Sequence, residues 1–345
     1  MRALVVAALL AACGGHDETA GAPAAKLAAV ERPSVADGPH SRVDEVRFDS
    51  AALGVSKRYF AYLPASYDKR RDARFPVFFY LHGLTGDEMS WLKGGHLDAA
   101  ADKLGLEAIV IMPDGDDGWY SDSDSPVDYD KCMKDGTGLF MPASQKPAET
   151  CVRHRKYETY ITRDLMKDVD ARYRTIHQRS GRGIAGLSMG GFGALQLAMR
   201  HPDLYAAAAS HSGVDSMFYK APHPYEAGKV ELITDVTDWQ RAVPQIGDWV
   251  VTLFGTDIAN WKAHDPVTLA QSLEPGKLAL YLDCGTEDDF QLQDAASYLH
   301  EVLTARHIEH TFFLGPGGHN FGFWGPRLPE SLAFLRAHTS PPQQP

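Results

Sequence analysis

Cysteines and basic residues are scarce in this chain of 345 residues, and both shortages exclude classes of function. The four cysteines form no C-x-x-C pair and no cluster with histidine at zinc-binding spacing, so we expect no metal site. Acidic residues outnumber basic ones by 45 to 34, which gives a net charge of −11. Because nucleic acids and anionic membranes are bound by clustered positive charge, we expect neither as a partner of the folded domain.

The start of the chain has an export signal rather than a membrane-spanning segment. Arg2 precedes an apolar run at residues 3–12, which is shorter than the about 20 residues that span a bilayer. This pattern is typical of a signal peptide. We therefore expect residues 1–12 to be a signal peptide, residues 13–41 a flexible tether rich in Gly, Ala and Pro, and residues 42–340 the folded domain.

Cys13 ends the stretch LAAC, which resembles a bacterial lipobox. A lipidated Cys13 would anchor the protein to a membrane, as a periplasmic or outer-surface lipoprotein. Ordinary cleavage after a small residue such as Ala12 is the alternative and would give a secreted protein. In an oxidising compartment Cys132 and Cys151 could close a surface loop, whereas Cys284 follows an apolar run and is expected to be a buried thiol.

The central feature of the sequence is the stretch GLSMGG at residues 186–191. A short apolar segment precedes it and the apolar-rich stretch 192–199 follows, so a strand, a tight turn and a helix are expected. This is the context of the nucleophile elbow, G-x-S-x-G, which exposes a serine to a base. We expect Ser188 to be the nucleophile, although a glycine-rich turn without chemistry would match the same letters.

Continuous apolar runs of strand length alternate with helical patterns from residue 75 to the end. Such runs are typical of strands buried on both faces, and the alternation predicts a mostly parallel sheet with helices on both sides. Residues 46–48 and 59–63 alternate instead, as in antiparallel strands. Further strands are expected near residues 76–81, 108–112, 183–185, 206–210, 278–282 and 311–314, and helices near 97–104, 160–173, 192–199, 295–305 and 329–337.

The catalytic base is selected by chain order. In α/β-hydrolases the triad runs Ser, then Asp or Glu, then His. Among the histidines after residues 278–282, only His319 directly follows the end of a predicted strand, where catalytic groups of parallel sheets gather. Four carboxylates, Asp283, Glu287, Asp288 and Asp289, are candidates for the acid, and spacing does not choose among them.

Two backbone amides are expected to hold the oxyanion. One belongs to Met189, directly after the nucleophile, at the start of a helix. The other belongs to Leu84, in the loop that follows residues 76–81, provided that Gly83 lets this loop turn sharply.

These stretches together resemble the esterase D-like branch of the α/β-hydrolases, which includes S-formylglutathione hydrolases, feruloyl esterases and mycolyltransferases. The matching stretches are LHGL at 81–84, GLSMGG at 186–191, GTEDDF at 285–290 and GHNF at 318–321. The resemblance implies an α/β-hydrolase fold, places the acid on Asp288, and places the oxyanion amides on Leu84 and Met189.

The resulting expectation is an exported serine carboxylesterase that hydrolyses a small-molecule or carbohydrate ester without a cofactor. An acyltransferase that passes the acyl group to an alcohol and a non-catalytic binding protein on the same fold are the alternatives. Long segments at 114–156 and 214–276 are expected to build binding walls. Trp119 and Tyr120 are candidates for an aromatic wall or for a packed loop, and the acidic residues at 114–124 are expected to form a solvated loop.

If the lipobox interpretation is correct, the exported protein should partition into detergent and begin at a lipidated Cys13. Stable anchoring needs more than one acyl chain, so intact-mass analysis should find a multiply acylated N-terminal peptide. A Cys13→Ala variant should lose this partitioning. A mature protein with a free N-terminus beyond Cys13 would rule out the anchor.

Overall fold

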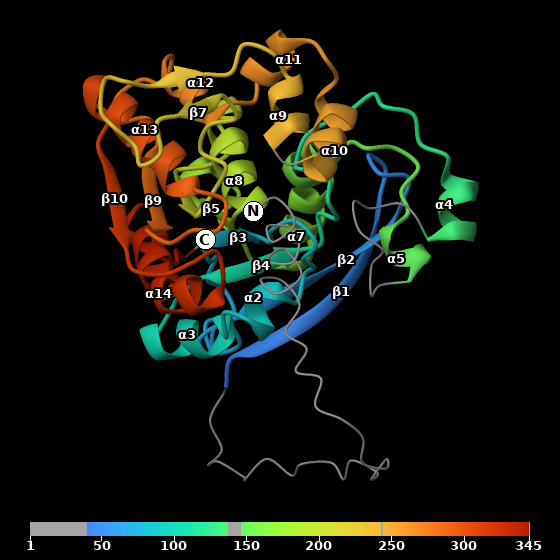
Figure 1. The fold of residues 1–345 in the computed structure, drawn as a ribbon. Coiled ribbons are helices and arrows are strands. Elements are labelled where there is room, and N and C mark those ends of the chain that lie inside the picture. Colours follow the sequence, from blue (N-terminus) through green and yellow to red (C-terminus); the bar gives the residue numbers. More distant parts are fainter. Residues whose placement is uncertain (1–39, 137–145, 243, 345) are drawn as a thin grey trace, which may run out of the picture.

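An eight-stranded, mostly parallel sheet forms the centre of the computed structural model, which describes residues 40–136, 146–242 and 244–344 (Figure 1). The strand order is β1-β2-β4-β3-β5-β6-β9-β10. Strand β2 runs antiparallel to both of its neighbours, and every other adjacent pair is parallel. The α/β-hydrolase sheet expected from the sequence is therefore confirmed. The predicted signal peptide, with Cys13, and nearly all of the predicted tether lie outside the described residues.

The strands of this sheet are β1 (Arg42–Ser50), β2 (Val55–Leu63), β3 (Val77–Leu81), β4 (Ile109–Pro113), β5 (Arg182–Leu187), β6 (Ala207–His211), β9 (Ala279–Gly285) and β10 (His310–Gly315). A small hairpin pairs β7 (Tyr219–Ala221) with β8 (Glu231–Leu232). The longer helices are α3 (Leu97–Leu104), α8 (Met189–Arg200), α10 (Pro244–Phe254), α13 (Leu292–Ala305) and α14 (Phe321–Ala337). The shorter ones are α2 (Ser90–Lys93), α4 (Tyr129–Asp135), α5 (Pro147–Thr150), α6 (Tyr157–Thr159), η1 (Tyr160–Leu165), α7 (Met166–Arg172), η2 (Arg179–Gly181), α9 (Thr237–Ala242), α11 (Ile258–Lys262) and α12 (Pro266–Ala270).

Each central strand contributes side chains to two separate hydrophobic cores. In β3, Val77, Phe79 and Leu81 belong to one core, whereas Phe78 and Tyr80 belong to the other. Successive side chains of a strand point to opposite faces, so a strand covered on both sides must be apolar at every position. This is why the strands could be recognised in the sequence as continuous apolar runs.

Helices close both cores. Helix α8 packs on β5 and β6, and α13 packs on β9, on the face of the first core. Helices α3 and α14 pack against each other on the opposite face, at the lower left of Figure 1. Within the described part of the chain, no helix is long and apolar enough to cross a membrane.

Four of the five predicted helices begin earlier in the chain than expected, and two of them differ in a way that has a clear cause or form. Helix α14 begins at Phe321, not at 329, because the side chain of Asn320 accepts a hydrogen bond from Gly322 N (2.8 Å) and caps the helix there. Its two prolines, Pro326 and Pro329, lie inside the helix, so Pro329 is not a start signal. The helix expected at 160–173 begins at Tyr157, and its middle part is π-helical.

The expectation of a solvated acidic loop at 114–124 is wrong for its first part. Asp114, Asp116 and Asp117 are at most 3% exposed. Lys57, from β2, is also buried and donates hydrogen bonds of 2.8 Å to the carboxylates of Asp114 and Asp116 and to the carbonyl of Glu149. A buried ammonium compensates the buried carboxylates, which is why an acidic run can lie inside the protein.

The cysteines at 132, 151 and 284 have the positions expected from the sequence. Cys132 and Cys151 form a disulfide. The two residues are 19 positions apart in the chain, and their Cα atoms are 5.8 Å apart. This disulfide lies within the first long segment, at 114–156. Cys284 is a buried free thiol in β9, which confirms the expectation.

Replacing Lys57 with Met should lower the free energy of unfolding by about 3–5 kcal/mol, because it leaves buried carboxylates without their counter-charge. Chemical denaturation followed by circular dichroism measures this change. Lys69→Met, at an exposed position, is the control and should shift stability by no more than about 0.5 kcal/mol. Equal stability of the two variants would contradict the structural role given to Lys57.

Candidate active site

Ser188 stands at the turn between β5 and α8 with a backbone conformation that side chains rarely adopt. Its φ and ψ are 53° and −121°, and it directly precedes the first residue of α8. A strained turn of this kind lifts the serine hydroxyl out of the sheet. The amide of Met189 lies at the positive end of the helix, where an oxyanion is stabilised.

Three glycines leave the space in which this turn forms. A Cβ on Gly186 would come within 2.2 Å of the carbonyl oxygen of Gly190, and a Cβ on Gly190 within 2.5 Å of that of Leu81. A Cβ on Gly83 would come within 2.6 Å of the side chain of Leu187. Gly83 thus lets the loop after β3 approach the turn at Ser188 closely.

His319 lies in the loop between β10 and α14, and its side chain is 3% exposed. Its Nε2 lies 2.9 Å from the Oγ of Ser188, and its Nδ1 lies 2.7 Å from Oδ2 of Asp288. With Nδ1–H donated to the carboxylate, Nε2 is free to accept the serine proton. The structure thereby brings together three residues that are separated by up to 131 positions in the chain.

The structure also separates Asp288 from the other three carboxylates. Asp288 is 4% exposed, whereas Glu287 and Asp289 are exposed. Asp283 is fully buried but pairs with a different histidine, His211, at 2.9 Å.

Both oxygens of Asp288 are held in place. Oδ1 accepts a hydrogen bond from Phe290 N at 2.9 Å, and Oδ2 also lies 3.7 Å from the thiol of Cys284. Burial raises the pKa of the Cys284 thiol well above its usual value, and the negative charge of Asp288 raises it further. The thiol therefore stays protonated and can donate to the carboxylate. The carboxylate is therefore fixed in the orientation that meets the imidazole.

Backbone hydrogen bonds join the loop that carries Asp288 to the loop that carries His319. Thr286 N donates to Gly315 O at 2.8 Å, and Glu287 N donates to Gly317 O at 3.0 Å. The imidazole of His319 is further held between two aromatic rings that meet it edge-on, Phe290 and Trp324, each with centroids 4.9 Å away. These contacts restrict the base to one position beside Ser188.

Leu84 and Met189, whose amides were expected to hold the oxyanion, both line the pocket that contains Ser188. The loop of Leu84 is anchored by its neighbour His82, which is 1% exposed. His82 Nε2 accepts from Gly115 N at 2.9 Å, so Nδ1 carries the proton and donates to Gly83 O at 2.8 Å. The ring is thus a structural element behind the loop.

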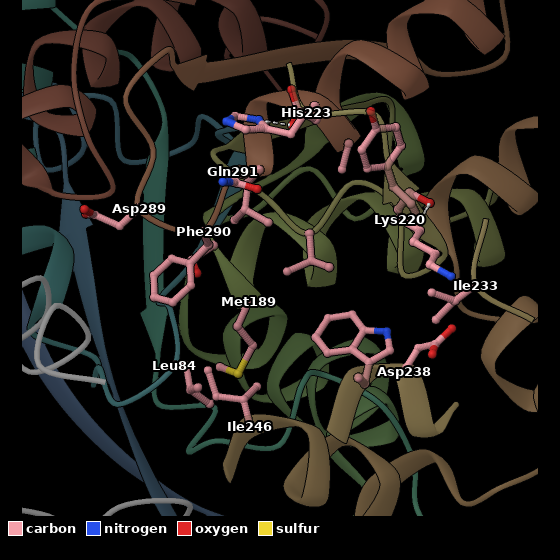
Figure 2. Close-up of a pocket in the computed structure, with 18 of the residues that line it drawn as sticks. Leu84, Met189, Lys220, His223, Ile233, Asp238, Ile246, Asp289, Phe290 and Gln291 are labelled. Atoms are coloured by element: carbon pink, nitrogen blue, oxygen red, sulfur yellow. Dashed lines mark hydrogen bonds and ion pairs between the residues drawn. The ribbon is translucent and has the colours of Figure 1, made fainter. Parts of the chain in front are cut away.

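The pocket has a volume of about 590 Å³, and Leu84, Met189 and Ile246 lie together on one side of it (Figure 2). Its apolar lining includes Trp119, Met189, Ile233, Trp239, Ile246 and Phe290. Charged groups line the rest of it, namely Lys220, His223, Asp238, Arg241, Asp289 and Asp294. Much of this lining comes from the segment at 214–276, which therefore forms a binding wall as expected.

The two aromatic candidates of the segment at 114–156 have different positions. Trp119 lines the pocket, where its ring meets those of Phe192 and Trp239 edge-on. Tyr120 is fully buried behind the site, and its hydroxyl donates to His82 O at 2.9 Å. Tyr120 therefore belongs to the packed loop and not to the pocket wall. Among the described residues, no group of three or more His, Cys, Asp or Glu is placed to hold a metal ion.

A family model described as "Putative esterase" matches residues 50–335, which includes all three members of the Ser188–His319–Asp288 arrangement. The chain belongs to this esterase family. The sequence had placed it in the esterase D-like branch, and that assignment is confirmed.

This esterase is similar to curated relatives of known name. It is 27% identical over 289 residues to Esterase Rv1288 of Mycobacterium tuberculosis, an alignment that covers 80% of this chain and 55% of the relative. It is 30% identical over 246 residues to an S-formylglutathione hydrolase of Paracoccus denitrificans, with 71% and 74% of the two chains covered. The chain thus spans about half the length of the mycobacterial relative.

Solved structures share the fold of this esterase. A ferulic acid esterase matches with a TM-score of 0.61 at 22% identity, covering 87% of this chain and 99% of the other. An S-formylglutathione hydrolase of Agrobacterium tumefaciens matches with a TM-score of 0.62 at 19% identity, covering 89% and 99%. At these identities the likeness concerns the fold alone.

Sequence reasoning missed the pocket residues that come from the short elements after β6. Ile233, Trp239 and Ile246 follow no motif, because they belong to a hairpin and two helices packed over the site. The only signal was the length of the segment that interrupts the alternation of strands and helices. The His82 and Asp117 contacts behind the oxyanion loop were missed too.

An Asp288→Asn variant should lose turnover on the order of 10⁴-fold, because an amide cannot hold the imidazole in the required tautomer. Glu287→Gln, at the exposed neighbouring position that does not line the pocket, is the matched control and should keep nearly all activity. Steady-state kinetics with a chromogenic ester measures both. A strong loss in Glu287→Gln with an active Asp288→Asn would overturn the choice of acid.

Proposed function

We propose that this protein is a serine carboxylesterase with Ser188 as nucleophile, His319 as general base and Asp288 as the orienting acid. The observation that supports this most strongly is the continuous chain of contacts, 2.9 Å from Ser188 to His319 and 2.7 Å from His319 to Asp288, at the wall of the pocket. Family membership supports the same class of reaction.

The proposed reaction follows from the position of each group. Ser188 Oγ attacks the ester carbonyl while its proton moves to Nε2 of His319. The imidazolium is stabilised by the carboxylate of Asp288, and the oxyanion is stabilised by the amides of Leu84 and Met189. His319 then protonates the leaving alcohol, and a water molecule, activated by the same histidine, releases the acid from Ser188. The proposed reaction needs no cofactor.

The pocket supports a substrate in which an apolar or aromatic group lies next to the ester bond. A cavity of about 590 Å³ is of the size that binds a medium-sized organic molecule. The apolar side chains of Leu84 and Met189 lie together, and the charged or polar side chains of Lys220 and His223 lie away from them at what we call the rim (Figure 2). A small-molecule or carbohydrate ester would place its apolar part inside and its hydroxyls at this rim.

We further propose that the protein is exported. The disulfide between Cys132 and Cys151 supports this, because disulfides persist in oxidising compartments and are rare in the cytosol. The signal-like residues 1–12 and the lipobox-like stretch at Cys13 agree with it, and they leave both a lipoprotein and a freely secreted protein possible.

Ser188→Ala should abolish hydrolysis of p-nitrophenyl esters, with a loss on the order of 10⁶-fold in kcat, because the residual rate comes from binding and the oxyanion hole alone. The fold should persist, which thermal unfolding will check. A Ser188→Ala protein with near wild-type activity would refute the proposal.

The same assay identifies the substrate group. A series of p-nitrophenyl esters of increasing acyl length, together with feruloyl and acetyl sugar esters, should show kcat/KM rising with apolar contact area by a factor of about 4 for each buried methylene until the cavity is full. Addition of an alcohol acceptor separates hydrolysis from transfer. Accumulation of the transferred ester in place of the free acid would favour the acyltransferase.

A further inference from the structure

We propose that Asp117 is a positioning residue that fixes the oxyanion loop and so sets the position of the Leu84 amide. The proposal rests on the proposed function, because it assigns a role in the same reaction. Asp117 does not line the pocket and is not part of the Ser188–His319–Asp288 arrangement. It lies in the segment that the sequence analysis had expected to be a solvated acidic loop.

The oxyanion loop contains a tight turn in an unfavourable conformation. Gly86 N donates to Gly83 O at 3.0 Å, so Leu84 and Thr85 are the two central residues of this turn. Thr85 has a φ of 65°, although a β-branched residue rarely adopts a positive φ. At the third position of a turn with this conformation glycine is normally found. Other contacts must therefore hold Thr85 in place.

Asp117 supplies the contact that holds it. Its Oδ1 accepts a hydrogen bond of 2.7 Å from Thr85 N, and the side chain is almost fully buried at 1% exposure. The amide of Thr85 belongs to the peptide unit that joins it to Leu84. In the more common type I turn, Thr85 would have a negative φ and the Leu84–Thr85 peptide would be flipped. This flip would point the Leu84 carbonyl oxygen at the Asp117 carboxylate. The repulsion between these oxygens opposes that flip.

Asp117 is itself held from two sides. The preceding residue, Asp116, is fixed by Lys57 at 2.8 Å and by the hydroxyl of Tyr157 at 2.7 Å. The backbone carbonyl of Asp117 accepts a hydrogen bond of 2.7 Å from Nε1 of Trp249 in α10. The buried charge cluster of Lys57 thus supports the segment that reaches the oxyanion loop.

The contact with Trp249 also joins the oxyanion loop to the wall of the pocket. Ile246, on the same helix, lines the cavity together with Leu84 and Met189 (Figure 2). Asp117 therefore connects through its side chain to the loop that stabilises the transition state, and through its carbonyl to a helix that contacts the substrate.

The test compares Asp117→Ala with Asp117→Asn, whose amide oxygen can still accept from Thr85 N. In Asp117→Ala, kcat for a p-nitrophenyl ester should fall about ten- to a hundredfold, less than when an oxyanion donor is deleted outright. KM should remain unchanged. The inhibition constant of a trifluoromethyl ketone, which forms a tetrahedral oxyanion on Ser188, should rise by the same factor. Asp117→Asn should stay close to the wild type in all three quantities.

A matched control is Asp87→Ala, since Asp87 lies in the same loop but its Oδ1 accepts from Met89 N at 2.8 Å instead. It should leave kcat and inhibitor affinity unchanged. If Asp117→Ala does not fold, Trp249→Phe replaces it, because phenylalanine keeps an aromatic ring at this position but lacks the N–H that binds Asp117, and kcat should fall with KM unchanged.

Three results would overturn the inference. One is an unchanged kcat in Asp117→Ala, or in Trp249→Phe where that variant replaces it. Another is a fall in kcat without loss of affinity for the trifluoromethyl ketone. The third is an equal loss in Asp117→Asn and Asp117→Ala. If instead the wild-type protein hydrolyses no ester, the proposed function fails and this inference fails with it.

Discussion

The site depends on a close approach of three backbone segments that leaves no room for side chains. Strand β5, helix α8 and the loop after β3 meet at Gly186, Gly190 and Gly83, where any Cβ would come within about 2.2–2.6 Å of a neighbouring atom. This approach lets Ser188 keep its strained conformation at the start of α8, in the pocket that Leu84 and Met189 also line. The strain is maintained because the strands and helix around it are buried on both faces of the sheet.

Polar contacts then connect the chemistry to the rest of the fold. The acid and base loops are tied to each other by backbone hydrogen bonds, and the base is held between two aromatic rings. On the other side, the buried Lys57 cluster supports the segment that contacts the oxyanion loop through Asp117. The site is therefore held from two sides, by the loops after β9 and β10 and by the segment after β4.

Much of this arrangement was predictable, and the limits of prediction have physical causes. Buried strands are apolar at every position, and chain order selects His319, so the fold and two of the three catalytic candidates follow from local patterns. The choice of Asp288 came from the family resemblance, because four neighbouring carboxylates look alike until the loop is folded. The burial of Asp114 and Asp116 could not be seen, since their partner Lys57 lies far away in the chain. Tyr120 and Trp119 are adjacent in sequence, but only the three-dimensional path of the loop decides which of them faces the pocket.

The most direct test of the account is the identity of the nucleophile. A fluorophosphonate reacts covalently with an activated serine, and mass spectrometry of the digested protein locates the adduct. The account predicts a single adduct on the peptide that contains Ser188, and its disappearance when His319 is replaced by Ala. An adduct on a different serine, or labelling of Ser188 that does not depend on His319, would contradict it.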